Sequence, residues 1–292
     1  MSQPGTLAVV GAGVMGTGIA TLAAGHGRPV VLIDVDRAAL DRAVAAVPGH
    51  LRLAQLLGKL PAGAATGVVE PATGLPAAAG AELVVEAVVE VPAVKAAVLA
   101  ELSGVVGPQT PIVSNTSAIP IDELAGHASH PERVAGAHFM NPPYLIRMVE
   151  VVRGPRTSGE TMRRLLALLA TLDREGVVVG DGPGFVINRV LQRMINEAAR
   201  IVSQGIADAE TVDRLFHGCL GHATGPLATA DLIGLDNVVD SLRVLRDRTG
   251  DPGYEPCQLL VELVGRGDLG RKSGRGFYPH PGGDRREIGG GR

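Results

Sequence analysis

Short apolar runs alternate with alanine-rich stretches over most of the chain. Runs rich in β-branched residues predict buried strands, and the longer alanine-rich stretches between them predict helices. The runs lie at Leu7–Val10, Val30–Ile33, Leu83–Val85, Ile112–Val113, Arg133–Ala137, Val149–Val152 and Val177–Val179. This alternation is typical of βαβ units around a mainly parallel sheet. For the Ala-, Gly- and Pro-rich stretch Pro61–Gly80 we expect a loose connection with a short strand near Val68–Val69.

The pattern changes after the glycine-rich segment Gly180–Gly184. The stretch Val186–Ser203 has its apolar residues at helical spacing, and further helical patterns follow it. The apolar positions of this first helix are Val190, Leu191, Met194, Ile195 and Ala198. The chain is therefore predicted to hold an α/β domain over residues 1–182 and an all-α domain over residues 183–292.

A glycine motif, Gly11-Ala12-Gly13-Val14-Met15-Gly16, stands between the first predicted strand and a helix-forming run. In such a motif Gly11 permits a tight turn, Gly13 lets the backbone approach a pyrophosphate, and Gly16 lets the helix pack close to the strand. The start of the helix then offers amides to phosphate groups. The motif therefore predicts a dinucleotide site that includes Gly11, Gly13, Val14, Met15 and Gly16.

An acidic residue, Asp34, ends the second predicted strand about 20 residues after the motif, as dinucleotide-binding domains require. A carboxylate there accepts hydrogen bonds from ribose hydroxyls and repels a 2′-phosphate, which favours NAD over NADP. Arg37 is the one residue that weakens this preference. The plainer interpretation is a glycine turn and a helix-capping aspartate. Strand, turn, helix and acid in this order favour a Rossmann-type, NAD-binding first domain.

Composition excludes several classes of function. The net charge is −3, aromatic residues make up 2% of the chain and Trp is absent, so neither nucleic acid nor a membrane surface is an expected partner. Cys219 and Cys257 lack the spacing of a metal site, and the histidines show no zinc-ligand arrangement, so no metal is predicted. We find no signal peptide or apolar membrane span and expect a cytoplasmic protein.

Several separated motifs carry a resemblance to a known family. Three of them are Ser114–Ser117, Ala137–Pro143 and Val149–Val151, and the others lie further along the chain. Those others are Pro183–Arg189, Gly225–Leu227, Asp231–Asp236 and Gly270–Tyr278. In this order the motifs resemble those of the 3-hydroxyacyl-CoA dehydrogenases, over roughly Thr6 to Tyr278.

The resemblance implies an active site in which His138 takes the proton of the substrate hydroxyl while hydride leaves the same carbon. The ordinary pKa of histidine suits this task, and Glu150 would hold the tautomer of His138 and stabilise its protonated form. Ser117 and Asn188 would hydrogen-bond the substrate oxygen. Asn141 would position the nicotinamide and the reacting carbonyl.

The resemblance also implies NAD contacts for Glu90, Lys95 and Lys272. Plainer interpretations exist for the polar set: a packed core histidine, a strand-edge glutamate, a helix-capping Ser117 and a helix-start Asn188. Each of these plainer interpretations is acceptable for its residue alone. Together, however, the four residues stand at the positions of the family's active-site residues, which favours the active-site interpretation.

Two segments depart from the family pattern. Leu57 stands where a lysine commonly contacts the nucleotide of coenzyme A, so that Arg52 and Lys59 are the basic residues left there. Lys59 is the residue we expect to bind the substrate. After Asn141, the segment Pro142–Arg147 replaces the more usual run of small residues rich in Val and Pro. We expect Tyr144 and Arg147 in this segment to reshape the acyl pocket or to bind a polar substituent.

The predicted activity is NAD-dependent interconversion of a 3-hydroxyacyl thioester and its 3-oxoacyl form, with short-chain substrates such as 3-hydroxybutyryl-CoA and a place in fatty acid metabolism. An alternative substrate is a hydroxyacyl group carried on an acyl carrier protein in polyketide extender-unit biosynthesis. Such a substrate has no coenzyme A nucleotide to bind, so it would tolerate Leu57 in place of a lysine. A non-catalytic, structural family member is a third hypothesis, and the intact polar set argues against it. The resemblance and the apolar helical faces predict a homodimer through the helical domain.

Overall fold

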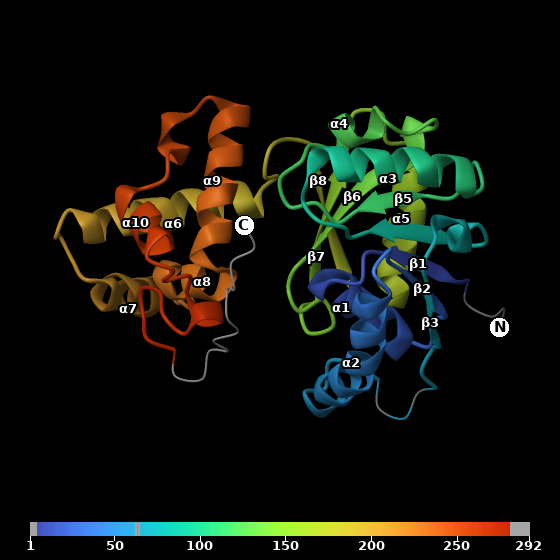
Figure 1. The fold of residues 1–292 in the computed structure, drawn as a ribbon, viewed down its shortest axis with the longest axis horizontal. Helices are drawn as coiled ribbons and strands as arrows, with labels where there is room; N and C mark the ends of the chain where they lie inside the picture. The colour runs from blue at the N-terminus through green and yellow to red at the C-terminus, as the bar shows by residue number, and fades with distance from the viewer. Residues whose placement is uncertain (1–4, 62, 64, 281–292) are drawn as a thin grey trace. The chain divides into compact units, whose positions relative to one another are not determined.

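The computed structural model describes residues 5–61, 63 and 65–280, and the chain divides into two compact units (Figure 1). The first unit is Met1–Phe185 and the second is Val186–Arg292. The break between the two units lies between Phe185 and Val186, and the division into domains at residues 1–182 and 183–292 stays a prediction.

An eight-stranded sheet forms the centre of the first unit, in the order β3-β2-β1-β4-β5-β6-β7-β8. The strands are β1 (Leu7–Val10), β2 (Val30–Ile33), β3 (Val69–Ala72), β4 (Leu83–Glu86), β5 (Ile112–Ser114), β6 (Val134–Phe139), β7 (Met148–Arg153) and β8 (Glu175–Gly180). Neighbouring strands are parallel except for β6 and β7, which are antiparallel. The predicted mainly parallel sheet is thus confirmed, with β3 longer than the short strand expected near Val68–Val69.

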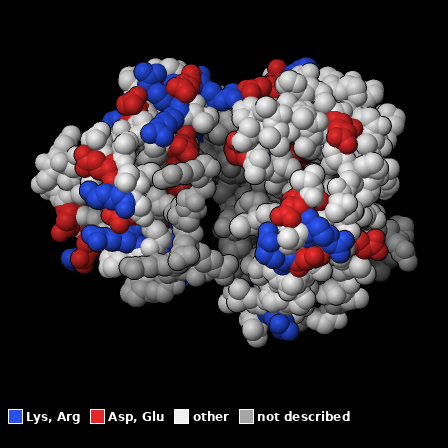
Figure 2. Space-filling model, viewed as in Figure 1, with Lys and Arg blue, Asp and Glu red and all other residues white. Residues whose placement is uncertain are grey.

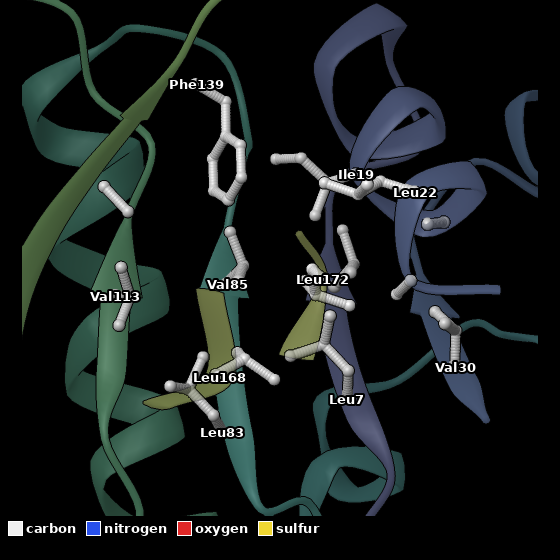
Figure 3. Packing of buried hydrophobic residues seen from close by; sticks show 14 of the residues in the cluster. Leu7, Ile19, Leu22, Val30, Leu83, Val85, Val113, Phe139, Leu168 and Leu172 are labelled. Carbon is white, nitrogen blue, oxygen red and sulfur yellow. The ribbon is translucent and has the colours of Figure 1, made fainter. Parts of the chain in front are cut away.

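Helices cover both faces of this sheet. They are α1 (Val14–Gly25), α2 (Arg37–Leu56), α3 (Pro92–Val105), α4 (Ile121–Ala125) and α5 (Gly159–Thr171), with 3₁₀ turns η1 (Leu75–Ala78) and η2 (Pro131–Arg133). Buried residues of α1, α2 and α5 share one apolar cluster with the strands, and those of α3 and α4 share another. Figure 3 shows Ile19 and Leu22 of α1 beside strand residues such as Leu7 and Val85. The unit therefore has three layers, helix–sheet–helix.

The strand order reverses direction at the pair β1 and β4, because β2 and β3 lie on one side of β1 while β5 and β6 lie beyond β4. In doubly wound sheets, ligands bind beyond the carboxyl ends of the strands at such a switch point. Gly11 follows β1 and Ala87 follows β4 at this place, which makes it the expected position of a dinucleotide.

The second unit is helical. Its helices are α6 (Ile187–Ser203), α7 (Ala209–Leu220), α8 (Pro226–Ile233), α9 (Leu235–Thr249) and α10 (Gln258–Gly265), with 3₁₀ turns η3 (Pro252–Tyr254) and η4 (Arg271–Ser273). Buried side chains from α6 to α10 form one apolar cluster. The predicted fold class, a Rossmann-type α/β unit followed by an all-α unit, is confirmed.

The surface carries charges of both signs. On the face drawn in Figure 2, basic and acidic side chains lie beside one another. In the described ranges, no helix has the length and apolar character needed to cross a membrane.

Candidate active site

The glycine motif forms the turn between β1 and α1, and sterics within the protein require a glycine at two of its three glycine positions. Gly11 has a φ of +105°, and a Cβ there would lie 2.5 Å from the carbonyl oxygen of Ala87. A Cβ at Gly16 would overlap the carbonyl oxygen of Gly11. At Gly13, by contrast, an added Cβ meets nothing within 4 Å. The backbone is therefore packed closely against other main-chain atoms at Gly11 and Gly16, and it is open to a ligand at Gly13.

Helix α1 begins at this opening with amides directed toward it. Its N-cap residue, Gly13, offers no side-chain cap, and the bond from Thr17 N to Gly13 O is 2.9 Å long. The amides of Val14, Met15 and Gly16 precede that bond and have no acceptor within the helix. Since a pyrophosphate accepts such amides and suits the positive end of the helix dipole, the turn fits the phosphates of NAD.

Asp34 lies just beyond β2, and both of its carboxylate oxygens are fixed by main-chain amides. Oδ2 accepts from Ala12 N at 2.7 Å and Oδ1 accepts from Asp36 N at 2.9 Å. A carboxylate oxygen can accept more than one hydrogen bond, so both can still bind ribose hydroxyls. The exposed Arg37 donates to Asp41 Oδ1 at 3.0 Å. The Asp34 carboxylate at the end of β2 thus fits the ribose of NAD.

His138 and Glu150 face each other across the antiparallel pair β6 and β7, where they are register partners. Nδ1 of His138 lies 3.0 Å from Oε2 of Glu150, and both residues are buried. The Phe185 ring lies 6.3 Å from the imidazole, centre to centre. Because the carboxylate engages Nδ1, proton exchange with a ligand falls to Nε2.

Glu90 and Ser117 are brought together at the carboxyl ends of β4 and β5. Oε1 of Glu90 accepts from the Thr116 hydroxyl at 2.5 Å and from the amides of Ser117 at 2.7 Å and Ala118 at 3.1 Å. The carboxylate of Glu90 therefore fixes the backbone that carries the Ser117 side chain.

Lys95 is almost completely buried, and its ammonium lies among three oxygens of the protein. Nζ is 2.8 Å from Glu86 Oε1, 3.2 Å from the Val88 carbonyl and 3.2 Å from Glu90 Oε2. Lys95 therefore holds Glu90 in place, and its direct contact with NAD stays a prediction.

Glu86 was missed by sequence reasoning. This fully buried carboxylate at the end of β4 also accepts from the Ser114 hydroxyl at 2.6 Å. The available signal was an acid that ends an apolar run, the same signal that identified Asp34.

The two segments that depart from the family pattern lie in different surroundings. Leu57 is 55% exposed, and Lys59 follows it on the surface. Tyr144 instead packs into the apolar cluster, stacked on His50 with ring centres 4.9 Å apart, and burial raises the pKa of its hydroxyl. Arg147 is exposed, 3.8 Å from Asp173. The ring of Tyr144 thus belongs to the packing of this unit, and a role in an acyl pocket stays a prediction.

Asn188 and Lys272 belong to the second unit. Asn188 lies in the first turn of α6, and Lys272 lies in η4, where its ammonium forms an ion pair with Asp236. Their approach to His138 and to NAD stays a prediction.

A dinucleotide-binding turn, an acid at the end of β2 and a buried histidine–carboxylate pair define an NAD-dependent dehydrogenase. Family models agree with this class. The NAD-binding domain of 3-hydroxyacyl-CoA dehydrogenase matches residues 6–182, and the C-terminal domain of the same enzyme matches residues 184–280. The chain belongs to the 3-hydroxyacyl-CoA dehydrogenase family. The resemblance stated from the sequence, the NAD cofactor and the oxidoreductase class are thereby confirmed.

Individual relatives are similar over nearly the whole chain. A probable 3-hydroxybutyryl-CoA dehydrogenase of Bacillus subtilis is 41% identical over 275 residues, which cover 93% of this chain and 96% of the relative. The 3-hydroxybutyryl-CoA dehydrogenase of Bradyrhizobium diazoefficiens is 38% identical, with 94% of each chain covered. The crystal structure of (S)-3-hydroxybutyryl-CoA dehydrogenase from Ralstonia eutropha superposes with a TM-score of 0.86 at 37% identity, covering 94% of this chain and 98% of that one.

Proposed function

We propose that the chain interconverts a short-chain 3-hydroxyacyl-CoA and its 3-oxoacyl form with NAD, and that 3-hydroxybutyryl-CoA is its substrate. The observation that carries the proposal is the buried pair of His138 and Glu150, 3.0 Å apart, in a chain of this family. The names of the relatives from Bacillus subtilis and Bradyrhizobium diazoefficiens support the choice of acyl group.

In the proposed oxidation, His138 Nε2 accepts the proton of the substrate hydroxyl, and Glu150 stabilises the imidazolium that forms. The chemistry supplied by bound NAD is acceptance of the hydride that leaves the same carbon. The Ser117 hydroxyl and the Asn188 amide hydrogen-bond the substrate oxygen, which becomes a carbonyl. His138 then releases its proton to solvent. In the reverse direction His138 donates a proton to the carbonyl oxygen of the substrate, which becomes the hydroxyl of the product.

The remaining residues hold the two ligands. Gly11–Gly16 and Asp34 bind the pyrophosphate and ribose of NAD, while Glu90, Lys95 and Lys272 also contact the cofactor. Asn141 aligns the nicotinamide with the reacting carbon, and Lys59 contacts coenzyme A. The carrier is coenzyme A, because the relatives are named for CoA substrates and none of the cited ones for a carrier protein.

The proposal is tested by comparing acetoacetyl-CoA, acetoacetyl-pantetheine and an acetoacetyl carrier protein as substrates for NADH oxidation. We expect the highest kcat/KM with acetoacetyl-CoA, because Lys59 and Arg52 remain to bind the nucleotide beside Leu57. A kcat/KM that is equal for CoA and pantetheine, and orders of magnitude higher for the carrier protein, would contradict coenzyme A as the carrier.

We further propose a homodimer through the helical unit and a cytoplasmic place in fatty acid metabolism. Helix α6 carries exposed apolar side chains, with Ile187 at 45% and Val190 at 63% exposure, as an interface requires. Light scattering of the purified protein at micromolar concentration should therefore give twice the mass of the chain. A monomer mass under the same conditions would contradict the dimer.

A further inference from the structure

A buried arginine, Arg174, lies in the turn between α5 and β8 and is only 6% exposed. Its guanidinium donates three hydrogen bonds, and all three go to main-chain carbonyl oxygens. Nε donates to Pro143 at 3.3 Å, Nη2 to Tyr144 at 3.2 Å and Nη1 to Asp173 at 2.9 Å. A planar guanidinium can reach two consecutive carbonyls in this way, which a lysine ammonium cannot imitate.

Burying this cation is costly. Burial lowers the pKa of Arg174 and the nearby Asp173 raises it, yet an arginine remains protonated at neutral pH. A charge removed from water destabilises a fold unless polar groups compensate it, and an apolar residue of similar size packs at lower cost. At Arg174 the three carbonyl acceptors supply this compensation, so the burial of the cation depends on the position of the Pro143, Tyr144 and Asp173 main chain.

The segment that Arg174 holds is the connection between β6 and β7, the two strands that carry His138 and Glu150. Arg174 contacts this connection at Pro143 and Tyr144, just after the exposed Asn141.

Other contacts hold the same connection from neighbouring elements. A Cβ at Gly18 of α1 would lie 2.6 Å from Cδ of Pro143, so the two pack closely. Tyr144 stacks on His50 of α2, and Glu175 N donates to the Arg147 carbonyl at 3.0 Å. In the part of the chain that the structure describes, the side chain of Arg174 donates to the Pro143 and Tyr144 carbonyls, while Leu145 N and Ile146 N donate to the Pro142 carbonyl at 3.0 and 3.2 Å. Arg174 therefore limits how far this loop can shift relative to the strands.

We propose that Arg174 is a positioning residue for the reaction: by fixing the carbonyls of Pro143 and Tyr144, it sets the place of Asn141 relative to His138. The inference rests on the proposed function, in which Asn141 aligns the nicotinamide with the reacting carbon. Misplacement of a reacting group by about 1 Å costs on the order of 10²-fold in rate. The pyrophosphate and ribose contacts lie elsewhere, at the glycine motif and Asp34. Loss of Arg174 therefore lowers kcat and leaves the affinity for NAD unchanged.

Arg133 provides a matched control. It is 2% exposed and also donates only to main-chain carbonyls in the described structure, at Ser103 (2.6 Å), Gly107 (2.6 Å) and Val106 (3.4 Å). These carbonyls end α3 and the turn after it, and Arg133 itself precedes β6, at the opposite end of that strand from His138. Its removal costs the same kind of buried hydrogen bonds without touching the loop of Asn141.

The test compares Arg174→Met and Arg174→Lys with Arg133→Met. For each protein we would measure the Tm, the Kd for NAD and the kcat for acetoacetyl-CoA reduction per site titrated with NADH. Arg174→Met and Arg174→Lys should lower kcat by about 10- to 100-fold with an unchanged Kd. Arg133→Met should lower only the Tm. If Arg174→Met fails to fold, Arg174→Lys carries the comparison, because it keeps the charge and most of the volume.

A wild-type kcat in Arg174→Lys, or a loss confined to the Tm as in Arg133→Met, would overturn the inference. Failure of the proposed function is a separate result, because it appears as inactivity of the wild-type protein with acetoacetyl-CoA before any variant is compared.

Discussion

Replacing His138 with glutamine is expected to lower kcat by about 10²- to 10⁴-fold, the usual contribution of a positioned general base. Glutamine has nearly the volume of histidine and can still hydrogen-bond Glu150, but it cannot accept a proton at neutral pH. The NAD site at Gly13 and Asp34 is built by other elements, so the Kd for NAD should not change. Steady-state kinetics with acetoacetyl-CoA and a fluorescence titration with NADH measure the two quantities.

A second histidine–glutamate pair serves as control. His130 Nδ1 lies 3.2 Å from Glu132 Oε1, but both side chains are about half exposed, at 47% and 53%. His130→Gln should therefore leave kcat unchanged, because a charge pair in water contributes little and lies outside the site. Near-normal turnover in His138→Gln would show that the base is another residue.

Replacing Asp34 with alanine is expected to raise the Kd for NAD by about 10- to 100-fold. The variant loses hydrogen bonds from a charged acceptor to the ribose, and such bonds contribute about 1.5–3 kcal/mol. It also removes the negative charge that repels a 2′-phosphate, so the preference for NAD over NADP should fall. The kcat at saturating NAD should change little, since Asp34 is remote from the reacting atoms. Calorimetric titrations with NAD and NADP measure both effects.

The neighbouring acid, Asp36, distinguishes a ligand contact from a backbone effect. Its side chain accepts from Ala38 N and caps α2. Asp36→Ala should cost about 1 kcal/mol of stability through the lost cap, with no change in the Kd for NAD. If Asp34→Ala and Asp36→Ala change the Kd equally, Asp34 is only a backbone-fixing residue.

The sequence predicted the sheet and the dinucleotide turn because both depend on local patterns. Buried parallel strands are continuous apolar runs, and Gly11, Gly13, Gly16 and Asp34 lie at spacings that the geometry of one βαβ unit imposes. The pairing of His138 with Glu150 is less local. It follows from β6 and β7 being antiparallel neighbours, and the family resemblance, rather than the spacing, identified it.

The buried charges could not be predicted in the same way. Lys95 and Arg174 are residue types that are usually exposed, and a sequence pattern cannot tell which of them finds partners inside the fold. Glu86 ends an apolar run, as Asp34 does, but that pattern does not show that its carboxylate pairs with Lys95 inside the fold. Tyr144 is a similar case, because its burial depends on His50, which is far away in the sequence. The burial of each of these residues is determined by tertiary contacts between elements. The periodic pattern of a helix or strand in the sequence does not predict such contacts.

We conclude that this chain is an NAD-dependent dehydrogenase of the 3-hydroxyacyl-CoA dehydrogenase family, and we propose that His138 is its base. Single-turnover mixing of NADH-loaded protein with acetoacetyl-CoA tests it most directly, with wild type and His138→Gln loaded to equal occupancy. The wild-type protein should consume one NADH per site, and His138→Gln should bind NADH equally well but consume it about 10²- to 10⁴-fold more slowly. Bound NADH that stays unoxidised in the wild-type protein, or is oxidised at the same rate in both, would contradict the claim.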